Sequence, residues 1–252
     1  MYTRHTLRRI CLAMIRDTLF ENLSRIIWTR VFQPRAAKYD GLTSKIIEMC
    51  CERQSNCVDV GAYRGTILKK MARVATEGVL YAFEPVPMNY NYLVKQYPDA
   101  ITYDFALSDV DGSHEFHYVS GRPARSGLYL RDYPDKKEIV EKLIVQTRQL
   151  DRVIPSDVPI RFMKVDVEGS ELQVFRGAER TIRKHKPTIL FEHGGEHKSN
   201  SESCYEILVD HFGMNIRTAR QFLDRSEPLS KDSFFSELYD NNEYYFVASY
   251  KQ

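Results

Sequence analysis

Largely apolar runs and amphipathic periods alternate along most of the sequence. Runs at residues 57–60, 79–83, 160–167 and 188–191 predict strands that are covered on both faces. Residues 66–75, directly behind the first run, place their apolar side chains at helical spacing instead. Strands that alternate with helices in this way predict an α/β fold, with a mostly parallel sheet and helices on both of its faces.

Local signals mark further elements. Pro87 stands at a first helical position, and Ser170 is expected to be the N-cap of one helix that buries apolar residues as far as Ile182. The other expected elements are helices at 40–54 and 202–212, a strand at 101–107, a hairpin turn at Asp111-Gly112 that leads into an antiparallel strand at 115–119, a charged loop with a short helical run at 120–145, and strands at 143–149, 214–217 and 243–250.

The first 40 residues differ from the rest of the chain. In residues 6–33, apolar side chains recur at helical spacing among arginines, and Gln33-Pro34-Arg35 is expected to end that helix. Residues 1–40 carry eight Lys or Arg against three Asp or Glu, whereas the remainder carries 28 against 31. Such a helix lies on a membrane surface or a partner, or it packs on its own domain or in a dimer with its arginines in solvent. We therefore expect a helical extension at 1–40 and one domain at 41–252, with an insertion at 108–150.

Composition narrows the class of protein. The chain has 252 residues, 43% hydrophobic and 28% charged, which suits one α/β domain with a sizeable core. A net charge of +2 gives no case for nucleic-acid binding. Five cysteines, odd in number and without C-x-x-C spacing, indicate neither a disulfide framework nor a zinc site and fit the reducing cytoplasm. The sequence contains no run of about 18 apolar residues, so no membrane span is predicted.

A glycine turn follows the first strand. Cys57–Val60 runs into Gly61-Ala62-Tyr63-Arg64-Gly65, after which the helical spacing begins. Glycines between a strand and a helix let a ligand approach the backbone at a helix N-terminus, where amide groups bind a carboxylate. The spacing of Gly61 and Gly65 differs from the G-x-G-x-x-G pattern of dinucleotide sites.

Acidic residues stand at the ends of the predicted strands: Asp59, Glu84, Asp166 with Glu168, and Glu192. Ligands bind outside the carboxyl ends of strands in open α/β sheets, so these acids would form one negative edge that repels phosphates and attracts a cationic ligand or a metal ion. Glu84 follows the glycine turn by about 20 residues, at the place where an acidic residue binds a ribose diol. A ligand with a ribose and a positive centre indicates S-adenosylmethionine (SAM), whose ammonium and sulfonium suit Asp59 and Asp166.

Four segments of the chain resemble a known enzyme family in residues, order and spacing. They are Val58-Asp59-Val60-Gly61-Ala62-Tyr63-Arg64-Gly65, Phe83-Glu84-Pro85, Ala106-Leu107-Ser108-Asp109 and the stretch from Lys164 to Ala178, which contains Asp166-Val167-Glu168-Gly169 and Arg176-Gly177-Ala178. Together they resemble the FkbM family of SAM-dependent methyltransferases over residues 55–250. The resemblance implies a Rossmann-like, seven-stranded sheet with an antiparallel last strand. It also implies O-methylation of a sugar, glycolipid, polyketide or other secondary-metabolite hydroxyl.

The resemblance also implies roles for single residues. Glu84 would bind the ribose of SAM, Pro85 would shape the turn beneath it, and Asp104 would lie near the adenine. The methionine part of SAM would be held by Asp59, Gly61, Ala62, Tyr63 and Gly65. An oxygen nucleophile must lose its proton during methyl transfer, and the candidate catalytic residues for that step are Asp166, Glu168 and His193, with Glu192 beside them.

Two further groups of residues are candidates for a metal and for the acceptor. Asp166, Glu192 and His193 resemble the metal-binding strand ends of magnesium-dependent sugar O-methyltransferases, although those enzymes usually have an acid where His193 stands. A Mg²⁺ ion there would bind vicinal sugar hydroxyls. Arg125 and Ser126, in the basic loop 121–131, are candidates for binding the acceptor; the alternative is a merely solvated loop.

Other classes of function stay open. An NAD(P)-dependent sugar oxidoreductase or epimerase needs Tyr-x-x-x-Lys, and the only such pair, Tyr133 and Lys137, is interrupted by Pro134. A non-catalytic, Rossmann-like binding module would keep the fold without turnover. For an enzyme, the expected partner is a small-molecule acceptor or a lipid-linked saccharide. Peripheral membrane contact through residues 6–33 and a homo-oligomer are further expectations, with a cytoplasmic location.

Overall fold

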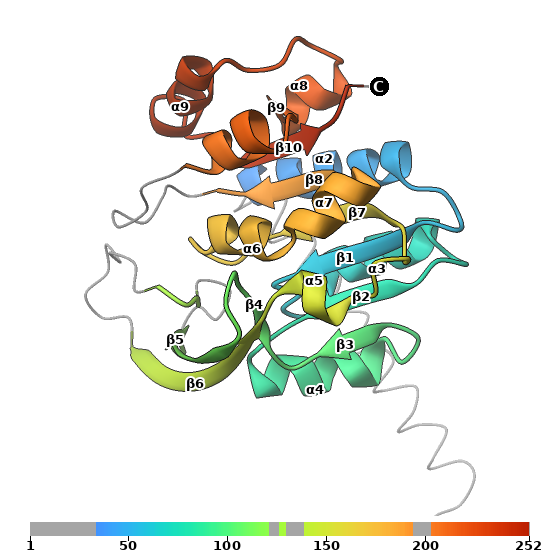
Figure 1. The fold of residues 1–252 in the computed structure, drawn as a ribbon, viewed down its shortest axis with the longest axis vertical. Coiled ribbons are helices and arrows are strands. Elements are labelled where there is room, and N and C mark those ends of the chain that lie inside the picture. Colours follow the sequence, from blue (N-terminus) through green and yellow to red (C-terminus); the bar gives the residue numbers. More distant parts are fainter. Residues whose placement is uncertain (1–33, 121–125, 130–138, 194–202, 252) are drawn as a thin grey trace, which may run out of the picture. The chain divides into compact units, whose positions relative to one another are not determined.

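The computed structural model describes residues 34–120, 126–129, 139–193 and 203–251 (Figure 1). The chain divides into two compact units, Met1–Leu42 and Thr43–Gln252. Helix α2 (Pro34–Cys50) crosses that boundary, and the helix expected at 6–33 lies outside the described residues.

Helix α2 corrects the bounds of the helix expected at 40–54, whereas the end expected at Pro34 for the preceding helix lies at the edge of the described residues. Residues 34–39 are already helical, and the helix ends at Cys50. Proline lacks an amide donor, but the first turn of a helix leaves that donor unpaired in any case, so Pro34 is compatible with helix.

The second unit is built on a seven-stranded sheet with the strand order β3-β2-β1-β7-β8-β10-β9. Neighbouring strands run parallel except β10, which is antiparallel to both β8 and β9. This arrangement confirms the predicted Rossmann-like sheet with an antiparallel last strand. The strands are β1 (Asn56–Val60), β2 (Leu80–Phe83), β3 (Ile101–Tyr103), β7 (Ile160–Val165), β8 (Thr188–Glu192), β9 (Asn215–Thr218) and β10 (Tyr245–Ser249).

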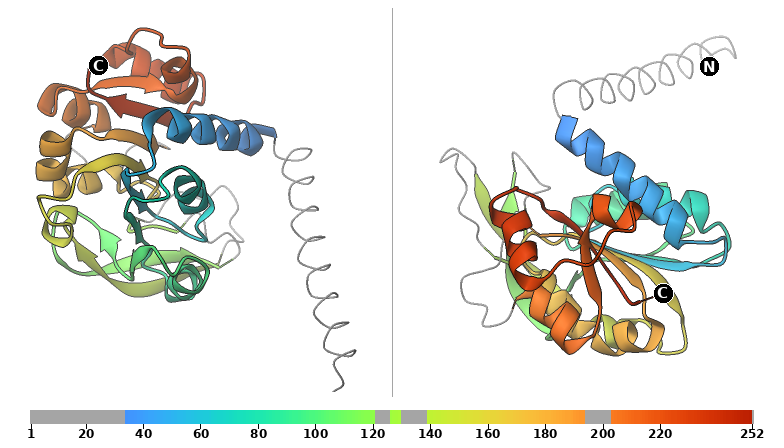
Figure 2. Two further views of the ribbon diagram at one scale, coloured as in Figure 1. Left: turned by 90° about the vertical axis from the view of Figure 1, so that its right-hand side faces the viewer. Right: turned by 90° about the horizontal axis from the view of Figure 1, so that it is seen from above.

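Helices cover both faces of this sheet, as predicted. The turned views of Figure 2 show α3 (Thr66–Val74) on one face and the pair α6 (Glu171–Gly177) and α7 (Glu179–His185) on the other. The apolar runs of the inner strands are therefore buried from two sides. The ring of Phe191 on β8 packs edge-on against that of Phe175 on α6, with ring centres 5.5 Å apart, and stacks beside that of Phe246 on β10, with ring centres 5.8 Å apart. These contacts hold the end of β8 that carries Glu192.

A second, three-stranded sheet confirms the strands expected at 115–119 and 143–149 and corrects the other expectations for residues 101–149. It consists of β4 (Ala106–Leu107), β6 (Val140–Arg148) and β5 (Gly112–Val119), in that order. The single strand expected at 101–107 is thus two strands in different sheets. The helical run expected before residue 145 is wrong where it overlaps β6, and residues 130–138 lie outside the described part.

The hairpin expected at Asp111-Gly112 is also wrong, because β4 and β5 both pair with β6 and not with each other. Polar contacts at the end of β6 explain the difference. Thr147 donates its hydroxyl to the carbonyl of Val110 at 2.8 Å, and Asp111 accepts the amide of Gln149 at 2.9 Å. The connection between β4 and β5, which contains Asp111-Gly112, is therefore hydrogen-bonded to the end of β6 and does not form a tight hairpin turn.

The helix expected to run from Ser170 through Ile182 is two helices, α6 and α7, that meet at Ala178. At Gly177 an added Cβ would lie 2.1 Å from the carbonyl oxygen of Ser108, so the chain passes very close to β4 at this point. Asp151 then accepts the backbone amide of Thr181 at 3.0 Å and caps the start of α7.

The remaining helices are α4 (Pro87–Gln96), α5 (Leu150–Val153), the π-helix η2 (Glu206–His211), α8 (Ala219–Leu223) and α9 (Lys231–Tyr239). Pro87 begins α4 and Gly213 follows η2 with φ +71°, both as predicted, whereas α5, α8 and α9 are short elements that the periodicity did not predict.

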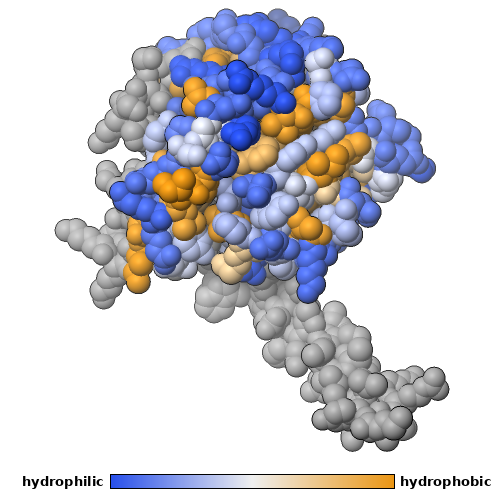
Figure 3. Space-filling model, turned by 60° about the horizontal axis from the view of Figure 1, so that its bottom comes forward, coloured by the Kyte–Doolittle hydropathy of each residue, from blue (hydrophilic) through white to orange (hydrophobic). Residues whose placement is uncertain are grey.

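The face drawn in Figure 3 shows apolar surface in separate patches among hydrophilic residues. Large apolar side chains that are exposed include Met88 and Val94 on α4 and Ile144 on β6. No helix among the described residues combines the length and apolar character that crossing a bilayer requires.

Candidate active site

The carboxyl ends of four adjacent strands lie side by side, because β2, β1, β7 and β8 are parallel neighbours. Asp59 lies in β1, Glu84 directly follows β2, Asp166 directly follows β7, and Glu192 ends β8. Sequence reasoning expected these acids at a common edge of the sheet, and the structure places them there.

The glycine turn after β1 has a steric reason that sequence reasoning missed. Gly61 has φ +75°, and an added Cβ would lie 1.9 Å from the carbonyl oxygen of Asp166. Gly65 has φ +74°, and its Cβ would lie 2.4 Å from the ring of Tyr97. Both glycines therefore serve close packing of this chain on itself, whatever they do for a ligand.

Glu84 is a buried carboxylate held by three donors. It accepts the amides of Tyr63 at 2.8 Å and Val86 at 3.0 Å, and the side-chain amide of Asn89 at 3.3 Å. Burial raises the pKa of Glu84, and these hydrogen bonds oppose that rise. Its Oε2 atom accepts only the amide of Tyr63 among the described residues, so a lone pair remains for another donor, such as a ribose hydroxyl.

Asp59 lies in β1, just before the glycine turn, and its side chain is 1% exposed. Burial raises the pKa of Asp59 to about 7, although the positive charge of Lys164 works against that rise. Within the part of the chain that the structure describes, its Oδ2 atom has no hydrogen-bond partner. A buried acid in this state is well placed to receive a donor that arrives with a ligand.

A cavity of about 580 Å³, part of it open to solvent, lies at this edge of the sheet. Of the residues predicted for the site, seven line it: Gly61, Tyr63, Glu84, Pro85, Ser126, Asp166 and Glu168. Six do not: Asp59, Ala62, Gly65, Asp104, Glu192 and His193. Asp104 is exposed between β3 and β4.

The cavity has a polar end and an apolar end. Asp166 and Glu168 line the first, whereas Val86, Phe116 and Leu128 are among the apolar residues that line the second. Phe116 comes from β5, in the second sheet, and packs with Val86 in a small apolar cluster. Sequence reasoning missed these residues; the available signal was the alternation within 115–119, which predicts a strand but does not show what Phe116 faces.

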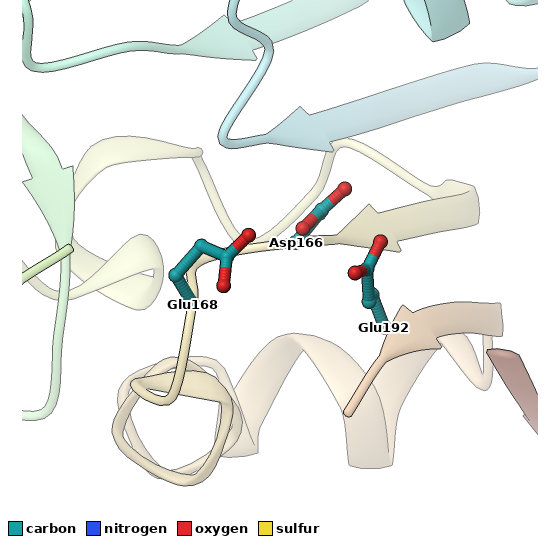
Figure 4. A group of neighbouring side chains, drawn as sticks. All are labelled: Asp166, Glu168 and Glu192. Carbon is teal, nitrogen blue, oxygen red and sulfur yellow. The ribbon is translucent and has the colours of Figure 1, made fainter. Parts of the chain in front are cut away.

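Three carboxylates meet beside the polar end of the cavity, two of them in its lining. Asp166, Glu168 and Glu192 each offer an oxygen, and these oxygens all lie within 4.8 Å of one another (Figure 4). Glu168 has φ +55°, a strained value for a residue other than glycine. Burial and the neighbouring charge of Asp166 raise the pKa of Glu192 to about 7, a rise that Lys164 opposes.

Lys164 supplies a positive charge to this group, which sequence reasoning missed. Its side chain is 1% exposed, and its Nζ atom lies 3.0 Å from Oδ2 of Asp166. The ammonium also lies 5.2 Å from the ring centre of Tyr245, whose hydroxyl bonds to Glu192. The available signal was a lysine within the apolar run of β7.

His193 lies in a different environment from the three carboxylates. Its side chain is 1% exposed, with Nδ1 3.5 Å from Oε2 of Glu171, and its ring stacks on Phe234 at 6.0 Å. Burial acts to raise the pKa of Glu171, but the hydrogen bond and charge of His193 bring it below its usual value. The structure thus joins Asp166 and Glu192 of the predicted metal group with Glu168, and places His193 in the core.

The predicted acceptor loop is described only in part, and Arg125 lies outside the described residues. Ser126 accepts the amide of Val119 at 3.0 Å, and Gly127 pairs with His117 in an antiparallel bridge. An added Cβ at Gly127 would lie 3.1 Å from the carbonyl oxygen of Glu168, so residues 126–128 pass close over the turn that carries Glu168.

Residues 59–225 match the model of the methyltransferase FkbM domain. The chain belongs to the FkbM methyltransferase family. The matched segment covers about two thirds of the chain and contains every residue that lines the cavity. This FkbM protein is accordingly a SAM-dependent methyltransferase.

Several solved structures resemble this FkbM protein distantly. One is a putative rRNA methylase from Clostridium thermocellum, with a TM-score of 0.45, 9% identity and coverage of 84% of this chain and 96% of that one. Another is Aeropyrum pernix fibrillarin with natively bound SAM, with a TM-score of 0.43, 13% identity and coverage of 83% of this chain and 74% of that one. A third is a TehB-like SAM-dependent methyltransferase from Corynebacterium glutamicum, with a TM-score of 0.41, 11% identity and coverage of 92% of this chain and 100% of that one. At such TM-scores, these similarities carry no argument about this chain.

No curated protein matches the chain at a significant level.

Two of the FkbM segments contact each other in the fold. Gly177 packs against the backbone of Ser108, and Arg176 lies 3.8 Å from the carboxylate of Asp109. The trailing Arg-Gly-Ala of one segment thereby holds the Ser-Asp of the other, next to strand β4 that lines the cavity. These motif residues brace the wall of the cavity.

Proposed function

We propose that this FkbM methyltransferase transfers the methyl group of SAM to a hydroxyl of a sugar, glycolipid or secondary-metabolite acceptor. The observation that carries the proposal is the group of three carboxylates, Asp166, Glu168 and Glu192, of which the first two line the polar end of the cavity. Carboxylates bind hydroxyl groups by accepting their hydrogen bonds, and one of them can take the proton that the nucleophile must lose.

The two ends of the cavity support one orientation of SAM. The ribose diol lies at Glu84, which has a lone pair free for a donor. The adenine lies at the apolar end, against Val86 and Phe116. The methionine part then lies toward Gly61 and Asp166, where the negative charge favours its ammonium and sulfonium.

Methyl transfer in this orientation needs a base beside the acceptor. The acceptor oxygen attacks the methyl carbon, the O–C bond forms as the S–C bond breaks, and S-adenosylhomocysteine leaves. The hydroxyl proton passes to Asp166, which lines the cavity and holds one oxygen against Lys164. Placing the nucleophile about 3 Å from the methyl group supplies much of the rate enhancement.

The charge of the site supports a neutral, hydroxyl-rich acceptor. Phosphates close to the three carboxylates would be repelled, whereas several hydroxyls can be bound at once. An amine acceptor would also suit negative charge, so N-methylation is an outcome that the experiment below must distinguish.

A Mg²⁺ requirement is a separate proposal. Asp166, Glu168 and Glu192 fit a hard cation in ligand type and spacing, and they replace the predicted set that contained His193. If bound, the ion would supply Lewis-acid activation of a sugar hydroxyl. The ammonium of Lys164 already offsets part of the negative charge on Asp166, which would weaken the ion's hold. An unchanged rate after treatment with a chelator would contradict the requirement.

The experiment that tests the function uses SAM with a labelled methyl group. The purified protein is incubated with labelled SAM and separate panels of glycosides, glycolipids, polyketides and amines, and the products are analysed by mass spectrometry. Label on a hydroxyl oxygen, strongly reduced in Asp166→Asn, is the expected result. Label only on nitrogen would replace the hydroxyl acceptor. SAM binding without transfer to any panel would favour a binding module, and NAD binding in place of SAM would favour an oxidoreductase.

The remaining expectations are proposals about context. Contact of residues 6–33 with membrane lipid would place the enzyme near a lipid-linked acceptor; a cytoplasmic location and a homo-oligomer are proposed beside it. Sedimentation with anionic vesicles, comparing the full chain with a chain that lacks residues 1–33, tests the lipid contact.

A further inference from the structure

Lys164 is the only lysine or arginine that is buried in the part of the chain that the structure describes. It lies in β7, between the parallel neighbours β1 and β8, and is paired in register with Asp59 and Leu190. Burying an ammonium in the middle of a sheet is costly unless opposite charges and polar groups compensate it. Its contacts therefore indicate why this position holds a lysine.

The contacts of the ammonium point toward the reaction edge. Nζ lies 3.0 Å from Oδ2 of Asp166, 3.5 Å from the carbonyl oxygen of Val165 and 5.2 Å from the ring centre of Tyr245. Tyr245 in turn donates its hydroxyl to Glu192. One buried cation thus joins β7 to β10, and through Tyr245 to the end of β8.

The ion pair has a dry partner and an accessible partner. The side chain of Lys164 is 1% exposed, whereas that of Asp166 is 30% exposed and lines the cavity. Lys164 does not line the cavity, so it does not touch an acceptor. Any effect of Lys164 on methyl transfer must act through the carboxylate that it holds.

We propose that Lys164 is a positioning residue for methyl transfer, whose buried ammonium fixes one oxygen of Asp166 so that the other faces the acceptor hydroxyl. This inference rests on the proposed function, in which Asp166 takes the hydroxyl proton. Without the ammonium, the carboxylates of Asp166, Glu168 and Glu192 repel one another with no cation among them, and Asp166 turns away from the others. The geometry of the base is then lost while the cofactor cavity stays intact.

The test compares Lys164→Met and Lys164→Arg with Lys142→Met, a matched control at an exposed lysine paired with Glu115. Methionine keeps most of the length of the side chain without its charge, whereas arginine keeps the charge in a planar, larger group. We expect kcat to fall by about 10- to 100-fold in both Lys164 variants, since a misplacement of about 1 Å at a reacting group has effects of that size. The SAM dissociation constant should change by a much smaller factor than kcat, because Lys164 lies outside the cavity and reaches SAM only through Asp166. Lys142→Met should match the wild type in both measurements.

A double-mutant cycle separates positioning from a merely structural role. Lys164→Met combined with Asp166→Asn removes both charges and leaves no isolated buried ion, so this variant should fold even where Lys164→Met alone does not. If Lys164 acts only through Asp166, the double variant has the same residual kcat as Asp166→Asn alone. If the kcat losses of the two single variants multiply in the double variant, the proposal is overturned. It is also overturned if Lys164→Met keeps at least half of the wild-type kcat. Loss of SAM binding in parallel with kcat would also overturn it, because that pattern is structural.

Failure of the proposed function looks different. Full activity in Asp166→Asn would remove Asp166 as the base, whatever Lys164 does. Activity that is lost in Asp166→Asn but kept in Lys164→Met would reject only the positioning role of Lys164.

Discussion

At the scale of single residues, Gly61 shows how close packing and ligand access meet at one position. Its Cα faces the carbonyl oxygen of Asp166 so closely that no side chain fits, and its φ of +75° disfavours other residues in any case. Gly213 has nearly the same φ, +71°, but nothing within 4 Å of an added Cβ. Comparing the two positions therefore separates the free-energy cost of the left-handed backbone from the cost of a steric clash between an added Cβ and the backbone.

We expect Gly61→Ala to be much more destabilising than Gly213→Ala. The second substitution should lower the free energy of unfolding by about 1–2 kcal/mol, the cost of a left-handed conformation. The first should lower it further and weaken SAM binding, because the turn must move away from β7. Urea denaturation and calorimetric titration with SAM measure both effects; equal losses in the two variants would show that the close approach does not matter.

Glu84 is expected to control the affinity for SAM. Glu84→Gln keeps the size of the side chain but loses the charge, so the dissociation constant should rise about 10-fold or more, in line with about 1.5–3 kcal/mol for a charge-assisted hydrogen bond. Glu84→Ala should in addition lower the melting temperature, because the amides of Tyr63 and Val86 lose their acceptor. Unchanged affinity in both variants would remove Glu84 from the cofactor site.

Asp59 makes stability depend on pH. Its pKa is about 7 in the folded protein, against an ordinary value of 3.8, so between these values the folded state holds a proton that the unfolded state has lost. The free energy of unfolding should therefore fall as pH rises from about 4 to 7 and level off above that. Asp59→Asn should remove this slope and gain about 2–4 kcal/mol relative to wild type between pH 5 and pH 8.

Urea denaturation of the two proteins at both pH values tests this expectation. The exposed Asp99, changed to Asn, is the control. A slope that persists in Asp59→Asn would assign it to other groups.

Sequence reasoning located part of the site and missed part of it, for physical reasons. Asp166 and Glu192 follow from strand ends, because parallel strands bring their carboxyl ends together. The role of Lys164 does not follow, since a lysine within a strand gives no sign of whether it faces solvent or a buried carboxylate. His193 adjoins Glu192 in sequence, but successive side chains of a strand point to opposite faces, which takes its ring into the core with Glu171.

At the scale of elements, the junction between α6 and β4 explains why the FkbM-like segment Arg176-Gly177-Ala178 has a glycine at its centre. Gly177 is helical, so alanine there would normally stabilise the helix by about 0.8–1 kcal/mol. Its Cβ would instead lie 2.1 Å from the carbonyl oxygen of Ser108. Packing between α6 and β4 therefore requires glycine at position 177, and no local sequence pattern indicates this packing.

Gly177→Ala is accordingly expected to destabilise the protein by about 2 kcal/mol or more, as overpacking against backbone does. Gly41, in helix α2, has nothing within 4 Å of an added Cβ, and Gly41→Ala should be neutral or stabilising. Thermal denaturation of both variants gives the comparison, and a stable Gly177→Ala protein would show that α6 can shift away from β4 at little cost.

The second sheet is expected to contribute to cofactor binding. Phe116→Ala should raise the dissociation constant for SAM by about 5- to 20-fold, because the adenine would no longer bury its apolar surface against the phenyl ring. Ile144 is 73% exposed on the neighbouring strand β6, and Ile144→Ala is the matched control that should bind SAM as the wild type does. If Phe116→Ala binds SAM normally, the adenine lies elsewhere in the cavity.

At the scale of the whole second unit, the main sheet could be predicted, whereas the second sheet could be predicted only as the two strands β5 and β6, without β4 and without their pairing. Strands of the main sheet are buried from two sides and read as apolar runs, so periodicity finds them. Strands β5 and β6 keep one face toward solvent and pair across a long separation in sequence, and β4 is only two residues long. The pairing of β4 with β6 depends on contacts such as that of Thr147 with Val110, which only the folded chain reveals.

The contact between Gly61 and Asp166 has a consequence for building hybrid enzymes from related chains. The backbone around residue 61 and the backbone around residue 166 are shaped to each other, although about a hundred positions separate them. A chimaera whose crossover falls between them inherits the two halves from different parents, and it will tolerate the swap only if both parents share that close fit. Crossovers placed beyond residue 170 keep the pair together, so exchanging the C-terminal segment leaves this close fit undisturbed.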